Sequence, residues 1–71
     1  MITQTLEQLE AGELQGAKQL KLSCQLTTFP EAIFSLSTTL EILDLSGNQL
    51  SELPNNLPQL SKLKILFLSD N

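Results

Sequence analysis

Cys24 carries the most reactive side chain in this sequence, because a thiolate can act as a nucleophile or as a metal ligand. Nucleophilic catalysis by cysteine needs an adjacent base, most often a histidine. The sequence contains no histidine, and the nearest positive charge along the chain is Lys21. We therefore expect no catalytic or redox role for Cys24. A single cysteine also excludes a disulfide within the chain.

Three glutamates near the N-terminus, Glu7, Glu10 and Glu13, recur at helical spacing. Grouped carboxylates could bind a hard cation, but this spacing does not match a calcium-binding loop. A solvated helix face explains the three residues better. No glycine motif for binding phosphate or a dinucleotide occurs in the sequence. We therefore predict that these 71 residues form no enzyme active site and bind no metal or cofactor.

The formal net charge is −4, from four lysines and eight acidic residues. Proteins that bind nucleic acids or anionic membranes need clustered positive charge, which four scattered lysines do not supply. The N-terminus lacks the basic and apolar regions of a signal peptide. The longest apolar run, residues 65–68, is too short to span a bilayer. We expect a soluble, cytoplasmic protein without a nucleic-acid or membrane partner.

The sequence repeats itself with a period of about 23 residues. Residues 63–71 align with residues 40–48 at a spacing of 23, with leucines, a serine and an asparagine at matching positions. Residues 20–23 match 43–46 at the same spacing, and the copy then lacks one residue before the similarity resumes. Such a period is typical of a solenoid, in which every copy is one structural repeat.

The stretch 40–50 reads L-x-x-L-x-L-x-x-N-x-L and resembles the leucine-rich repeat family, whose motif allows asparagine or cysteine at the ninth position. This resemblance implies an α/β fold: a right-handed leucine-rich-repeat solenoid with a short parallel sheet and an N-terminal capping helix. We expect Cys24 to be buried and inert at the motif's cysteine position, and Asn48 to hydrogen-bond the backbone of its bend. The predicted segments are a cap at 1–16, repeats at 17–39 and 40–62, and an incomplete repeat at 63–71.

In each copy the leucines of a short strand should point inward, and the residues between them should face the concave side of the sheet. The ladders across the sheet would then be 19–42–65 and 21–44–67. The apolar members of these ladders indicate a contact surface, although the β-propensity of strand positions explains them equally well. Lys21 and Asp44 would be neighbours and could form an ion pair. The predicted partner-binding residues are Gln19, Lys21, Ile42, Asp44, Ser46, Ile65, Phe67 and Ser69.

Residues 5–8, TLEQ, have the form of a capping box, and Gly12 suits the position after a helix, so we predict a helix over 6–11. Leu6 and Leu9 share one face of this helix. They would cover the first repeat, with partner binding as the alternative role. Together with residues 22–34, the segment resembles the start of bacterial leucine-rich-repeat proteins that continue into a protein kinase domain. That resemblance implies a second function, as the N-terminal regulatory or docking part of a kinase, although no kinase motif occurs in this sequence.

The third copy reaches Asn71 with a strand but without the return path that follows the second copy. We therefore expect its strand to form an unprotected sheet edge. The leucines at positions 63, 66 and 68 should be partly open to water. The sequence thus predicts another protein of unknown identity as the main partner, together with self-association through the C-terminal edge.

Overall fold

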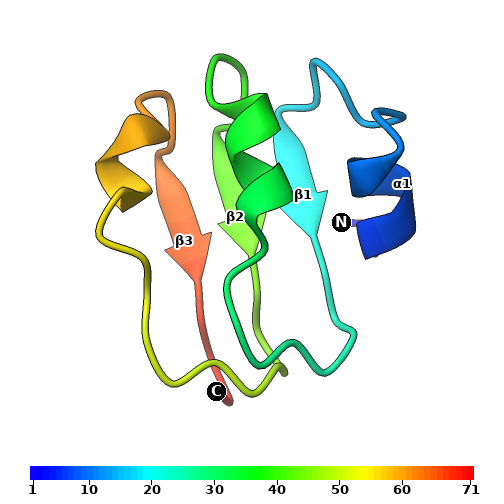
Figure 1. Ribbon diagram of the computed structural model, residues 1–71. Coiled ribbons are helices and arrows are strands. Elements are labelled where there is room, and N and C mark those ends of the chain that lie inside the picture. The colour runs from blue at the N-terminus through cyan, green and yellow to red at the C-terminus, as the bar shows by residue number, and fades with distance from the viewer.

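A computed structural model describes residues 1–71 and contains one parallel sheet of three strands in the order β1-β2-β3. β1 spans Gln19–Lys21, β2 spans Ile42–Asp44 and β3 spans Ile65–Phe67. The strands lie side by side, and each crossover between them carries a short helical turn (Figure 1). The chain therefore folds as a small α/β unit with the architecture of a leucine-rich-repeat solenoid.

The strands pair in the register that the sequence period predicts. Gln19, Ile42 and Ile65 lie opposite one another across the sheet. The central leucines of the strands form the next ladder, and the ladder after that contains Lys21, Asp44 and Phe67. The 23-residue spacing thus brings equivalent residues of successive copies to the same height in the sheet.

The core is a column of aliphatic side chains on the inner side of the sheet. The inward leucines of β1 and β2 are fully buried, whereas Leu63, Leu66 and Leu68 of the third copy are only partly buried, as the sequence predicts. The buried apolar residues are Leu9, Leu20, Leu22, Leu26, Ile33, Leu36, Leu40, Leu43, Leu45, Leu50 and Leu60.

The crossovers return through 3-10 helices, η1 at Glu31–Leu36 and η2 at Leu57–Gln59. Ile33 and Leu36 of η1 are both buried. A 3-10 helix has three residues per turn, so side chains three apart project from the same face. Pro58 lies in the first turn of η2, where the lack of an N–H costs nothing. The return path of the second copy is thus a tight helical turn and not a strand.

Helix α1 spans Leu6–Glu10, one residue shorter than predicted, because Ala11 is its C-cap. The predicted capping box is present: the Thr5 hydroxyl accepts from the Gln8 N–H, and the Gln8 side chain accepts from the Thr5 N–H, both at 3.0 Å. Gly12 follows with φ +78°, the left-handed conformation that ends many helices. Leu9 is buried against the first repeat, so α1 covers the end of the core.

Gln4, which precedes the capping box, forms hydrogen bonds with the outer edge of β1. The Gln4 N–H donates to the Lys21 carbonyl at 2.8 Å, and the Gln4 side-chain oxygen accepts from the Lys21 N–H at 2.9 Å. The side-chain amide of Gln4 donates to the Gln19 carbonyl at 3.2 Å. A single glutamine therefore bonds three backbone groups at this edge, the Gln19 carbonyl and the N–H and carbonyl of Lys21. None of the helices has the length and apolar composition needed to cross a bilayer.

Candidate functional site

The turns after β2 and β3 are held by hydrogen bonds from asparagine side chains. The Asn48 side chain is buried and accepts from the N–H groups of Cys24 and Leu26, each at 3.1 Å. It donates to the Leu22 and Leu45 carbonyls at 2.9 and 2.8 Å. One amide thus joins two successive copies, because backbone groups in a buried bend have no water to bind.

Asn71 repeats this arrangement one copy later. Its side-chain oxygen accepts from the Leu50 N–H at 3.0 Å, and its amide donates to the Leu45 and Leu68 carbonyls. The expectation that Asn48 hydrogen-bonds the backbone of its bend is therefore confirmed, and Asn71 does the same one copy later. This ladder fixes the ends of β2 and β3, and with them the side chains that the strands present to solvent.

The side of the sheet opposite the core carries six of the predicted partner-binding residues. We call this surface the open face; its residues are Gln19, Lys21, Ile42, Asp44, Ile65 and Phe67. Its character changes across the sheet, from polar on β1 to apolar on β3. Ile65 and Phe67 are 43% and 45% exposed, whereas Ile42 is half-buried between its neighbours. The structure thus brings the predicted apolar cluster together and leaves it open to solvent.

Lys21 and Asp44 are neighbours in the sheet but form no ion pair. An Asp44 carboxylate oxygen instead accepts from the Ser46 N–H at 3.0 Å, within its own turn. The ion pair in the structure joins Lys64 and Glu41 at 3.8 Å. Glu41 directly precedes β2, and Lys64 directly precedes β3. The Lys21 ammonium therefore has no carboxylate partner in the structure.

The two predicted serines take part in the turns that follow β2 and β3. The Ser46 hydroxyl accepts from the Ser69 N–H at 3.2 Å, and the Ser69 carbonyl accepts from the Gly47 N–H at 2.9 Å. Ser46 is half-buried and Ser69 is exposed. These contacts join neighbouring turns, so the two serines lie at the margin of the open face and also support its geometry.

Cys24 lies on the surface, and the expectation of a buried thiol is wrong. The first copy lacks one residue in this turn, and its left-handed residue is Gln25, with φ +59°. The shortened turn directs the cysteine side chain outward, while the Cys24 N–H remains bonded to Asn48. The backbone of the first turn thus depends on the asparagine of the next copy rather than on a residue of its own.

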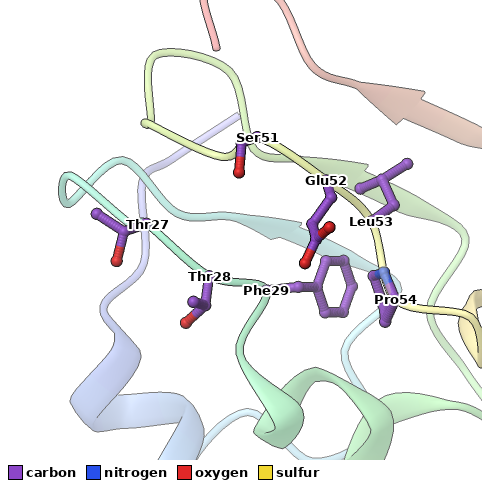
Figure 2. A pocket seen from close by; sticks show the side chains of 7 residues that line it. All are labelled: Thr27, Thr28, Phe29, Ser51, Glu52, Leu53 and Pro54. Carbon is purple, nitrogen blue, oxygen red and sulfur yellow. The ribbon is translucent and has the colours of Figure 1, made fainter.

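A hollow of about 200 Å³ lies between the loops of the first two copies. Residues 27–29 and 51–54 surround it (Figure 2). Its polar side chains, two threonines, a serine and Glu52, come from exposed loop positions. Phe29 is half-buried and packs on Phe34, with ring centroids 5.6 Å apart. The hollow offers no buried base or nucleophile to perform a reaction.

Residues that could hold a metal ion are not grouped in this fold. No three His, Cys, Asp or Glu side chains lie close enough together to share an ion. Glu7, Glu10 and Glu13 are exposed around α1, as a solvated helix end would be. Several of the predicted site residues lie together on the open face instead.

One important residue, Gln4, has no signal in the sequence pattern. It precedes the capping box and belongs to no repeat, so neither periodicity nor motif identifies it. Its contribution depends on the position of α1 against the first copy. Only that packing brings the Gln4 side chain level with Gln19 and Lys21.

Comparison with known proteins agrees with the architecture. Residues 39–60 match the family model described as Leucine Rich Repeat. An uncharacterized leucine-rich repeat-containing protein of Schizosaccharomyces pombe is 43% identical over 49 residues. The similarity covers 69% of this chain and 8% of that much longer protein. No solved structure matches the chain.

The family match falls on the copy whose asparagine is buried in the turn, and this copy shares its sheet with the copies before and after it. Neither the family model nor the yeast relative adds a link to protein kinases. The recurring leucines, the asparagine-held turns and the parallel sheet agree with the match of residues 39–60 to the leucine-rich repeat model, so the chain folds as a unit similar to a leucine-rich-repeat solenoid.

Proposed function

We propose that the open face is a protein-binding surface with its apolar centre at Ile42, Ile65 and Phe67. The observation that supports this most strongly is the exposure of Ile65 and Phe67, two large apolar side chains on one short strand. Clustered apolar side chains on a solvated face are typical of contact sites. Stacked repeats in general use such extended sheet surfaces to bind partners.

The polar residues of the open face define which partner would suit it. Lys21 has no carboxylate partner in the structure and lies one strand away from Asp44. A complementary partner would place an aliphatic or aromatic side chain against Phe67 and a carboxylate near Lys21. The apolar contact would supply most of the affinity, and the charges would set the orientation.

The test begins by trapping the partner in cells that produce the protein. A photo-crosslinking amino acid is placed at Ile65, with Gln59 of η2 as the matched control on an exposed position away from the sheet. The affinity of the purified partner is then measured by calorimetry. We expect Phe67→Ala to weaken binding at least about tenfold, roughly 1.4 kcal/mol, because aromatic residues near an interface centre carry much of the affinity.

Folding must be separated from binding in this experiment. Phe67 is nearly half exposed, so its removal should alter the free energy of unfolding much less than the binding energy. The variant Gln59→Ala should leave both quantities unchanged. A partner that binds Phe67→Ala and Ile42→Ala as tightly as the unaltered protein would exclude the open face as its site.

A second candidate function is supported by the N-terminal segment alone. Residues 5–9 and 22–34 resemble the start of bacterial leucine-rich-repeat proteins with a kinase domain. On this hypothesis the unit is a docking or regulatory part of a kinase, and the open face would bind the substrate or a regulator. Reading the coding sequence downstream of Asn71 tests it. The hypothesis predicts that the downstream reading frame encodes a glycine-rich loop and a catalytic aspartate loop. A reading frame that encodes neither motif would reject the hypothesis.

A further inference from the structure

The hollow between the loops of the first two copies has a lining whose order follows from the repeat. Residues 27–29 are equivalent to residues 51–53 at a spacing of 24. The Gln49 N–H donates to the Leu26 carbonyl at 2.8 Å, which aligns the two loops immediately upstream. The lining therefore runs from the hydroxyls of Thr27 and Ser51, past Glu52, to Phe29 and Pro54 (Figure 2).

The polar side chains of the hollow have no partners within the protein. The Glu52 carboxylate takes no part in the ion pair of the structure, which joins Lys64 and Glu41. The serine and threonine side chains that form hydrogen bonds lie elsewhere, at Thr5, Ser35, Thr39 and Ser46. Figure 2 shows the Glu52 side chain directed from the second loop toward Phe29 of the first. A ligand with positive charge and several donors would satisfy these groups.

The apolar end of the hollow is held in place by packing. Phe29 is half-buried against Phe34, with ring centroids 5.6 Å apart and ring planes at 42°. Pro54, also half-buried, borders the same end. An aromatic ring attracts a cation over its face and also offers an apolar surface to methylene groups. A long side chain with an apolar stem and a cationic head therefore matches both ends of the hollow.

We propose that this hollow binds an arginine side chain of a partner protein. The guanidinium donates to the Glu52 carboxylate and to the neighbouring hydroxyls, and the methylene stem lies along Phe29 and Pro54. The volume of about 200 Å³ is smaller than the ~300–1,000 Å³ of pockets that enclose a whole small molecule, and it suits one side chain. The hollow shares no residue with the open face, so occupancy of one surface does not require occupancy of the other.

Other ligand classes fit the hollow less well. An anion would be repelled by Glu52, because no lysine lines the hollow. A metal ion would find one carboxylate and no group of ligands around it. A lysine ammonium is a point charge, whereas the planar guanidinium offers a fork of donors to a carboxylate and a flat face to an aromatic ring. The formal net charge of −4 also favours a basic partner.

Proton–nitrogen NMR spectra of the isotope-labelled full chain test the proposal. The probe is N-acetyl-arginine N-methylamide, which carries an arginine side chain between two peptide bonds as in a protein. Its titration should shift the amide signals of residues 27–29 and 51–53 with a millimolar dissociation constant, because one side chain supplies only part of an interface. The citrulline analogue, which keeps the shape but loses the charge, should bind at least about threefold more weakly. The lysine analogue should also bind more weakly, because it lacks the planar fork.

Two variants with the same change in charge test the role of Glu52. Glu52→Gln should weaken binding of the arginine probe at least about threefold. Glu10→Gln, on α1 and away from the hollow, should leave the affinity unchanged. Both positions are exposed, and the dispersion of the spectra checks that both variants are folded. Equal affinities of the two variants would overturn the proposal, as would shifts centred outside the two loops or equal binding of the arginine and lysine analogues.

Discussion

Replacing Asn48 by alanine tests the view that one buried amide holds two repeats together. The change removes bonds to the N–H groups of Cys24 and Leu26 and to the carbonyls of Leu22 and Leu45. The Leu45 carbonyl keeps a donor, because the Asn71 amide also binds it at 2.9 Å. The Cys24 N–H is only part-buried, so water can replace its partner.

Two backbone groups then remain buried without a partner, the Leu26 N–H and the Leu22 carbonyl. Each such group costs about 1–3 kcal/mol, so the free energy of unfolding should fall by about 2–6 kcal/mol. A domain of 71 residues has in total about 4–11 kcal/mol, at about 0.05–0.15 kcal/mol per residue. The Asn48→Ala protein should therefore lose a large share of its stability and unfold at a much lower urea concentration than the unaltered protein.

Urea unfolding followed by circular dichroism measures this loss. Asn55→Ala is the matched control, because Asn55 is exposed and its side chain makes no hydrogen bond. Asn71→Ala should give a smaller loss, since its site lies at the more open end of the core. Equal unfolding midpoints for Asn48→Ala and Asn55→Ala would refute the reasoning, because the asparagine would then contribute no net stability.

Further predictions concern the cap, the turns and the thiol. Leu9→Ala should lower the free energy of unfolding by about 2–5 kcal/mol, because Leu9 is buried, and the exposed neighbour Glu10 serves as the control in thermal unfolding. Gly47→Ala should cost about 1–2 kcal/mol through its φ of +74° alone, because the added Cβ meets only the Ser23 hydroxyl, at an ordinary 3.7 Å. Gly47→Asn should recover part of that loss in the same urea titration, and an alanine variant as stable as the parent would contradict the argument. Cys24 should react with a thiol reagent in the native protein nearly as fast as in the urea-unfolded chain, whereas strong protection would show that the thiol is covered.

The repeat pattern predicts much of the fold because a solenoid is built from local, recurring contacts. The 23-residue spacing between Leu43 and Leu66 suffices to predict the strands, their order and their register. The capping box at Thr5 and Gln8 is similarly local, since each of its bonds joins residues three apart. Interactions of this kind depend on sequence spacing, and a reader of the sequence can place them without knowing the rest of the chain.

Part of the candidate site can also be predicted from sequence spacing. Alternation along a strand predicts that Ile42, Ile65 and Phe67 share one side of the sheet. The degree of exposure is a different matter, because it depends on how many neighbours each strand has. Ile42 is half-buried between two strands, whereas Ile65 and Phe67 belong to an edge strand and remain open.

Tertiary structure decided the features that depend on contacts between segments with no shared pattern. Packing of α1 on the first copy brings Gln4 to the edge of β1, and no periodicity encodes that position. A single missing residue turns Cys24 outward, since the length of a turn sets the direction of every side chain in it. The Asp44 carboxylate bonds its own turn rather than Lys21, because a nearby N–H competes with a cation on the next strand. The sequence alone therefore determined the repeat and its register, whereas the Gln4 contacts, the exposed thiol and the free lysine required the packed structure.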